Sequence, residues 1–229
     1  MLALRAYVRY LVPFTLLSAL VLAPALWLTF QIPIPGEPAQ ATRILGFTSM
    51  LGAIAWIAQL VLVGGVAPAV RAVQLGAPLP QLRALGLGIA GLVKMVLPCL
   101  LAVAAIGLGS LALVLPGLAL LVLLSVTGAS TERGMPGPLL DSIAVVRANL
   151  KIVAIAVAAM LVLDLALPGV ARMVTTTPLP KKPTVEQLAA YQHLARMVAL
   201  ALVIASPIIA SVLAAIRVSA RPPRARAAD

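Results

Sequence analysis

Charged residues are scarce in this chain of 229 residues, and most of them fall between long apolar runs. Only 10% of the residues are charged, whereas 62% are hydrophobic. A soluble domain of this size needs far more polar side chains to cover its surface, so the composition excludes an ordinary soluble protein. Several runs reach the roughly 20 apolar residues that a helix needs to cross a bilayer. The sequence therefore predicts an all-α integral membrane protein.

Cysteine and histidine are almost absent, which removes several kinds of site. The chain has one cysteine, Cys99, and one histidine, His193. These two residues can form neither an internal disulfide nor a metal-binding cluster. Hydrolytic and metal chemistry depend on grouped His, Asp and Glu side chains, and the six acidic residues are spread along the chain. We therefore expect no catalytic site, no metal, no cofactor and no enzymatic activity.

Aromatic residues make up only 3% of the chain, although the net charge is +11. Proteins that bind nucleic acid usually gather their Lys and Arg in one patch or stripe. Here the basic residues are dispersed between apolar runs, so we expect no nucleic-acid partner. Dispersed cations of this kind are instead typical of the cytoplasmic loops of membrane proteins.

Six apolar runs are separated by short connections rich in proline and glycine. The first run is longer than the about 7–15 apolar residues of a signal peptide, so we interpret it as a retained span. The sequence predicts one transmembrane domain over residues 1–220, a polytopic helix bundle, followed by a short basic tail, 221–229, that we expect to be disordered. The expected transmembrane helices cover residues 10–30, 44–66, 88–109, 115–130, 152–174 and 194–216.

Glycine and proline mark the expected ends and bends of these spans. Gly64 and Gly65 are expected to end the second span. Pro98 is expected to kink the third, because a proline frees the carbonyl four residues before it. The turn between the third and fourth spans has two candidates, residues 107–110 and 115–117, and the sequence leaves the choice open.

The basic residues divide unevenly between the two sides that this threading creates. Excess Lys and Arg mark the cytoplasmic side, so we expect both termini in the cytoplasm. The excess of Arg over Lys, with abundant alanine, is typical of GC-rich bacterial genomes, which predicts the cell inner (plasma) membrane. One side would hold Arg5, Arg9, Arg71, Arg83, Lys94, Arg133, Arg147, Lys151, Arg217, Arg221, Arg224 and Arg226, and the other Arg43, Arg172, Lys181, Lys182 and Arg196.

Two ionisable residues fall inside expected spans. Asp164 lies in the middle of 152–174, where a carboxylate costs about 2.5–3.5 kcal/mol on insertion scales. Such an acid usually faces the bundle interior and is a candidate functional residue. A proton or ion relay and an interhelical hydrogen bond, for example to Lys94, are both open, and the hydrogen bond is favoured. Lys94 lies near the cytoplasmic end of its span, where its long side chain can reach the interface.

Residues 86–91 spell G-x-G-x-x-G, a pattern known from nucleotide-binding proteins. That function needs a preceding strand, a following helix and an acidic residue about 20 positions later. None of these is predicted here. We therefore interpret the small residues as positions that allow helices to pack closely in lipid.

Polar residues are arranged, rather than excluded, in segment 131–151. Asp141 and Ser142 come first and Arg147 and Lys151 last, which is the order that a helix dipole favours. Together with the apolar spacing, this predicts a short amphipathic helix in the cytoplasmic membrane interface. A headgroup-binding role for its two cations is open, and simple anchoring is favoured. The apolar residues at helical spacing are Leu139, Ile143, Val146 and Leu150.

Residues 115–149 carry Pro116 and Gly117 before an apolar run, Glu132 after it, and then a run of matching residues. This pattern resembles the YciC-like and glycerophosphoryl-diester-phosphodiesterase membrane-domain group of bacterial multi-pass proteins, which carry "PG", an acid and then "A-L-x-x-S-x-x-L-V-R-G-N". Pro138 and Ala148 depart from it. The resemblance implies about six helices and no settled activity; the phosphodiesterase domain of some members has no counterpart here. The matching residues are Leu139, Ser142, Val146, Arg147 and Asn149.

These expectations lead to two functional hypotheses. The favoured one is a non-enzymatic membrane component that acts by helix packing, either with lipids of the bilayer or as a subunit or scaffold of a membrane complex. Its partners would be lipids, other membrane-protein subunits or further copies of the chain. The alternative is a small transporter or permease that uses Asp164 and Lys94. The candidate functional polar residues are Lys94, Glu132, Ser142, Arg147, Asn149 and Asp164.

Overall fold

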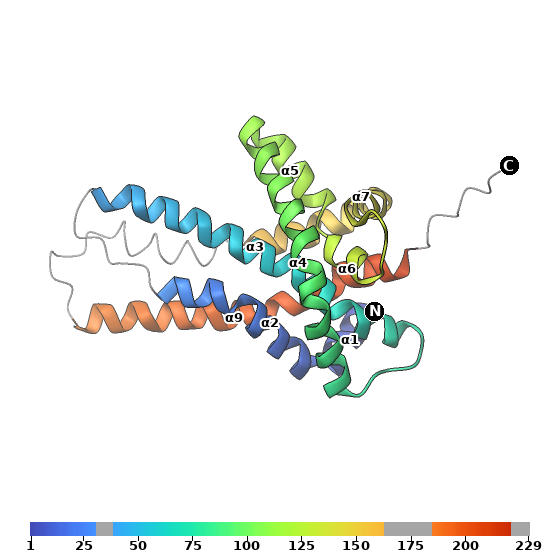
Figure 1. Cartoon of the computed structure of the whole chain (residues 1–229). Coiled ribbons are helices and arrows are strands. Elements are labelled where there is room, and N and C mark those ends of the chain that lie inside the picture. Colours follow the sequence, from blue (N-terminus) through green and yellow to red (C-terminus); the bar gives the residue numbers. More distant parts are fainter. Residues whose placement is uncertain (31–38, 163–184, 221–229) are drawn as a thin grey trace.

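The computed structural model describes residues 1–30, 39–162 and 185–220, which are almost entirely helical. No strand occurs in these ranges, so the predicted all-α class is confirmed. Figure 1 shows the arrangement of the helices. They are α1 (Leu2–Arg9), α2 (Leu11–Phe30), α3 (Ala39–Gln74), α4 (Gln81–Ala112), α5 (Val114–Leu123), α6 (Thr127–Glu132), α7 (Pro138–Ala148), a helix over Leu150–Val162, and α9 (Val185–Ser219).

Four stretches among the described residues are long and apolar enough to cross a membrane. Two further pairs of helices qualify if each bent pair counts as one span: α1 with α2, bent by 85°, and α7 with Leu150–Val162, bent by 110°. The structure therefore supports a membrane protein with four to six spans. The four single stretches are Ile54–Gln74, Gln81–Leu111, Leu115–Glu132 and Leu200–Ser219.

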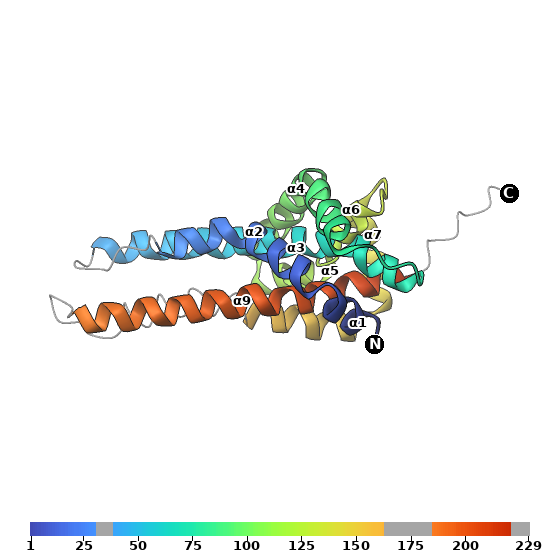
Figure 2. The ribbon, with the colours of Figure 1, turned by 90° about the horizontal axis from the view of Figure 1, so that it is seen from below.

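Helices α2, α3 and α9 lie side by side, as Figures 1 and 2 show from two directions. Leu22 of α2 packs with Ala58 of α3 and Leu202 of α9, and further along, Leu17 of α2 meets Gly65 of α3. Residue numbers fall in α2 as they rise in α3, so these two helices are antiparallel.

Helices α3 and α9 run parallel to each other. The buried amide nitrogen Nε2 of Gln59 donates to Oγ of Ser206 over 2.7 Å. Further along both helices, Arg71 and Arg217 line the same cavity. The carboxyl ends of α3 and α9 therefore lie at the same end of the molecule, as does the beginning of the antiparallel α2.

Helix α4 crosses α3 instead of running alongside it (Figure 1). Gly88 and Met95 are seven positions apart on α4, yet they meet the adjacent residues Gly65 and Gly64 of α3. A Cβ atom added at Gly88 would lie 2.9 Å from the carbonyl oxygen of Gly65. Glycines at the crossing let the two backbones approach closely. The packing interpretation of the G-x-G-x-x-G pattern is therefore confirmed at Gly88, whereas Gly86 faces open space.

Gly64 and Gly65 lie inside α3, so the expectation that they end a helix was wrong. The helix continues through Pro68 to Gln74. A Cβ atom added at Gly64 would lie 2.7 Å from the carbonyl oxygen of Gly128 in α6. The two glycines therefore allow neighbouring helices to pack closely on two sides of α3. In the sequence alone, adjacent glycines of this kind resemble the end of a helix.

The turn between α4 and α5 falls at Leu113, between the two candidates that the sequence left open. Leu113 has extended backbone, with φ −163° and ψ 148°, and separates the two helices. Gly117 of α5 lies directly against Ser110 of α4. Both candidate segments thus belong to helices that pack against each other, and the chain reverses between them.

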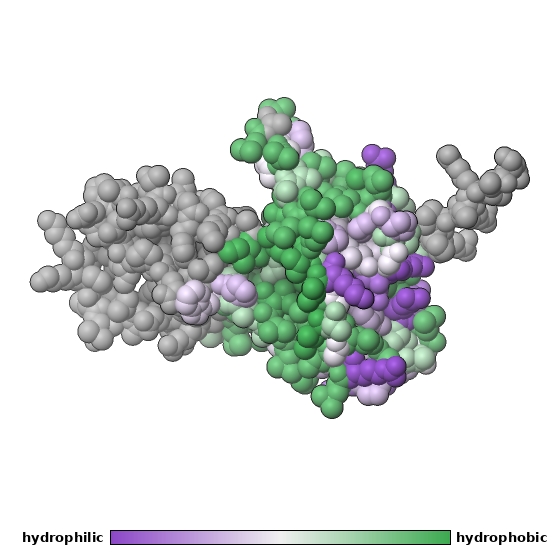
Figure 3. Space-filling model, viewed as in Figure 1, coloured by the Kyte–Doolittle hydropathy of each residue, from purple (hydrophilic) through white to green (hydrophobic). Residues whose placement is uncertain are grey.

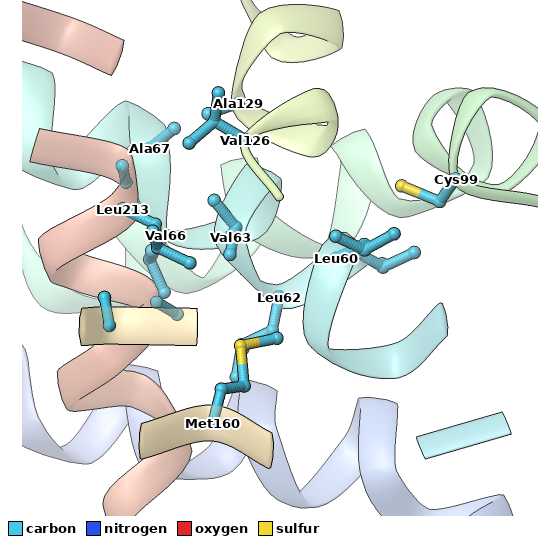
Figure 4. Close-up of a cluster of buried hydrophobic side chains, with 14 of the residues drawn as sticks. Leu60, Leu62, Val63, Val66, Ala67, Cys99, Val126, Ala129, Met160 and Leu213 are labelled. Atoms are coloured by element: carbon cyan, nitrogen blue, oxygen red, sulfur yellow. The ribbon is translucent and has the colours of Figure 1, made fainter. Parts of the chain in front are cut away.

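Helix α3 is the centre of the core. In an 18-residue segment of its stretch Ile54–Gln74, 78% of the residues are buried, compared with 22% in an 18-residue segment of the stretch Gln81–Leu111 of α4. Figure 4 shows side chains from several helices around α3. Cys99 of α4 is fully buried in this cluster. The labelled residues are Leu60, Leu62, Val63, Val66, Ala67, Cys99, Val126, Ala129, Met160 and Leu213.

Candidate functional site

Hydrophilic side chains gather at one end of the molecule, where α6, α7 and the last turns of α9 lie (Figure 3). Most of the remaining coloured surface in this view is hydrophobic. The loop before α7 contains Gly134 with a positive φ of 73°, a turn conformation that suits glycine. Helix α7 then begins with Pro138 in its first turn.

A buried ion pair joins α7 to α9 at this end. The Nε atom of Arg217 lies 2.6 Å from Oδ2 of Asp141, and the two side chains are only 1% and 6% exposed. The same Nε atom lies 3.2 Å from Oγ of Ser130 in α6, to which it donates. One arginine thus ties together the ends of three helices.

The positions of the two charges follow from the helices that carry them. Asp141 lies in the first turn of α7 and Arg217 in the last turn of α9. An acid near a helix N-terminus and a cation near a C-terminus are both favoured by the helix dipole. Removing a charge from water is costly, and a nearby opposite charge offsets that cost only when the geometry is good. The pair is therefore a specific link between α7 and α9.

Arg217 also lines a cavity at this end of the molecule. Nη1 and Nη2 are buried and have no hydrogen-bond partner among the described residues. The cavity has a volume of about 320 Å³. Its polar lining comes from α3, α6 and α9 and the residue after α6. The lining residues are Arg71, Gln74, Leu75, Ala129, Glu132, Arg133, Arg217 and Val218.

Three arginines line this cavity together with one acid, Glu132. Arg71 is exposed, Arg133 is half-buried and Arg217 is buried, so the three cations that line the cavity differ in their access to solvent. Arg133 also donates from Nη1 to the carbonyl oxygen of Ala220 over 3.3 Å, which holds it beside the end of α9. Chemically, the site is suited to an anion with several oxygen acceptors.

The sequence candidates do not form one site. Glu132 lines the cavity. Ser142 is buried and donates to the carbonyl oxygen of Leu123 over 2.8 Å, which fixes α7 to the end of α5. The side chain of Asn149 donates to the carbonyl oxygen of Val145 within its own turn.

The remaining candidates lie elsewhere. Lys94 is exposed on α4, and Arg147 is exposed on α7. Asp164 lies outside the described residues. The interhelical hydrogen bond expected for Asp164, for example to Lys94, and the use of both residues by a transporter therefore stay predictions.

Helix α7 differs from the amphipathic interface helix that the sequence predicts. Asp141 and Ser142 are buried with Val145 and Val146, so the polar first turn points into the protein. Leu140 is 74% exposed. The expected apolar face is only partly correct: Leu139 and Ile143 pack against the core, and Val146 is buried, but Leu150 is exposed at the start of the next helix.

Sequence reasoning missed Asp141, Ser130 and Arg217 as site residues. The residue order places Asp141 at the start of a helix, and the basic-residue count places Arg217 among the cytoplasmic charges. One signal was present: Asp141 is one of only six acids in a chain with 17 basic residues. An acid that is so rare is a good candidate partner for a basic residue, but the sequence does not say which one.

A second cavity, of about 570 Å³, lies along α7 and is lined mostly by apolar side chains, with Asp141 and Asn149 among its lining residues.

Residues 1–30, 39–162 and 185–220 contain no group of three or more His, Cys, Asp or Glu side chains that could hold a metal ion. The charged groups that the described residues bring together are the ion pair of Asp141 with Arg217 and the arginine-lined cavity beside it.

The fold and this site define an all-helical membrane protein with four to six candidate spans, and with a buried ion pair beside an arginine-lined cavity at one end. Comparison with protein-family models, curated proteins and solved structures finds no match to this chain.

Proposed function

We propose that this chain is a non-enzymatic, multi-pass protein of the cell inner membrane that acts through its helix surfaces, on lipids or as a subunit of a membrane complex. The observation that carries the proposal is the exposure of α4, α5 and the turn between them. Leu97 is 65% exposed, Leu108 is 69% exposed and Leu115 is 78% exposed. Apolar side chains exposed along more than one helix need lipid or another protein to cover them.

The proposal includes six spans, with both termini on the cytoplasmic side. Three arginines that the sequence assigns to that side, Arg71, Arg133 and Arg217, line one cavity. The parallel course of α3 and α9, with α2 antiparallel to both, supports an even number of crossings. The likeness to the YciC-like group supports the same threading, since it implies about six helices.

Single-cysteine labelling tests this threading in a Cys99→Ala background. Cysteines at Ala77 and Ser219 should react with a membrane-impermeant maleimide only in inverted vesicles. Cysteines at Gln40 and Glu186, at the opposite ends of α3 and α9, should react in intact spheroplasts. The reason is that α3 and α9 run parallel and each crosses the bilayer once. Labelling of Gln40 and Ala77 from the same side would contradict the proposal.

Photocrosslinking tests what covers α4 and α5. A benzophenone amino acid at Leu97, Leu108 or Leu115 should give adducts either with phospholipid or with a discrete second protein chain. The same probe at Cys99, which is fully buried, is the control and should crosslink only within the chain. Probes that react with neither lipid nor protein would show that this surface faces water, which contradicts the proposed function.

A further inference from the structure

Arg217 is a buried arginine whose guanidinium group makes only part of the hydrogen bonds it can donate. Its side chain is 1% exposed, and Nε is engaged by Asp141 and Ser130. Its two terminal nitrogens are buried without hydrogen-bond partners among the described residues, and Arg217 is one of the residues that line the 320 Å³ cavity. Buried donors without partners are costly, and the planar guanidinium group matches the oxygens of a phosphate. A cavity lined by this arginine is therefore suited to an anion.

The other lining residues narrow the class of anion. Arg71 and Arg133 add two more cations, and Gln74 adds an amide. Glu132 is the single acid in the lining and, when ionised, can only accept hydrogen bonds. A ligand that complements all of these groups carries a phosphate and, close to it, a hydroxyl or ammonium donor for Glu132.

The location of the cavity points to the source of that ligand. It lies at the carboxyl ends of α3 and α9, two helices with stretches apolar enough to cross a membrane. The end of a spanning helix lies at the level of the lipid headgroups. Leu75, Ala129 and Val218 add apolar surface to the lining, which suits the glycerol part of a lipid.

We propose that the cavity formed by Arg71, Glu132, Arg133 and Arg217 binds a phosphate ester with an adjacent hydrogen-bond donor, supplied by a phospholipid headgroup such as that of phosphatidylglycerol. This inference rests on the proposed function, in that it takes the helices to be embedded in a bilayer. It adds a defined binding site to that function.

Native mass spectrometry of the full chain in mild detergent tests the site. Phosphatidylglycerol should bind more tightly than phosphatidylcholine, whose headgroup offers no donor to Glu132. The double variant Arg71→Gln with Arg133→Gln should weaken phosphatidylglycerol binding about tenfold, because it removes charge-assisted hydrogen bonds. The control, Arg83→Gln with Arg147→Gln, removes the same charge from two exposed arginines outside the cavity and should weaken binding less than about twofold.

Equal losses in the two double variants, or equal binding of the two lipids, would overturn the proposal. Arg71→Gln alone changes an exposed residue and serves as the test if the double variant does not fold. Glycerol phosphate and inorganic phosphate are added as soluble competitors. If these competitors do not displace the lipid, the result supports a phospholipid headgroup as the ligand. If glycerol phosphate binds in the absence of lipid, the proposal that a phospholipid supplies the phosphate is overturned. Extraction with alkaline carbonate is measured in parallel. If the protein stays in the membrane but binds no headgroup, only the proposed binding site is contradicted. If the protein is released from the membrane, the proposed function is contradicted as well.

Discussion

Asp141→Ala and Arg217→Ala should each lower the free energy of unfolding by about 3–5 kcal/mol, because each leaves a buried charge without its partner. The two charges lie 2.6 Å apart and are almost fully shielded from solvent. The loss should appear as a lower midpoint in reversible denaturation of the protein in detergent micelles.

The double variant Asp141→Leu with Arg217→Met should recover most of this loss, since replacing a buried ion pair by apolar residues is often neutral or stabilising. Arg147→Met, a change at an exposed residue of α7, is the control and should change stability by about 0.5 kcal/mol or less. If the single variants cost no more than this control, Asp141 and Arg217 do not form a buried pair. Recovery in the double variant separates loss of the pair from general damage to α7 or α9.

Gly128→Ala should destabilise the protein by about 1–3 kcal/mol, as overpacking of a core does. Gly128 is the point at which α6 contacts α3. A Cβ atom there would overlap the carbonyl oxygen of Leu60 and lie 3.0 Å from the backbone nitrogen of Gly64. Backbone atoms on the opposing helix cannot move aside as a flexible side chain can, so α6 would be pushed away from α3.

Gly107→Ala is the matched control for Gly128→Ala. Gly107 also lies in a helix, but a Cβ atom there would meet nothing within 4 Å. Alanine favours a helix over glycine by roughly 0.5–1 kcal/mol, so this variant should be neutral or slightly stabilised. Thermal denaturation of both variants in the same detergent measures the difference. Equal effects of the two substitutions would show that α6 and α3 are not in backbone contact at Gly128.

The class of the protein could be predicted from composition because hydrophobicity acts on each residue largely independently of the fold. Long apolar runs with charges between them predict membrane helices wherever they occur. The helical character of 138–148 could also be predicted, since the residue order suits a helix dipole. Its orientation could not: Asp141 and Ser142 point inward because Arg217 of α9 and the carbonyl of Leu123 provide partners.

The role of each glycine could not be predicted from the sequence. A glycine can allow a turn, and it can also allow two helices to touch, and the residue itself is the same in both cases. Gly134 has a positive φ and makes a turn, whereas Gly64, Gly88 and Gly128 lie at helix contacts. The distinction depends on which other backbone lies nearby, and that is a property of the packed chain.

The sequence by itself determined that this is an all-helical membrane protein, because the balance of apolar and charged side chains decides between water and lipid before any contact forms. Only the tertiary structure decided that α4 crosses α3, that Asp141 pairs with Arg217, and that three arginines meet around one cavity. The reason is physical: these features join residues up to 146 positions apart (Arg71 and Arg217), and no local preference of either partner specifies such a contact. Such contacts are specified only when the helices pack, because small residues then allow close approach and buried charges are then neutralised by a partner.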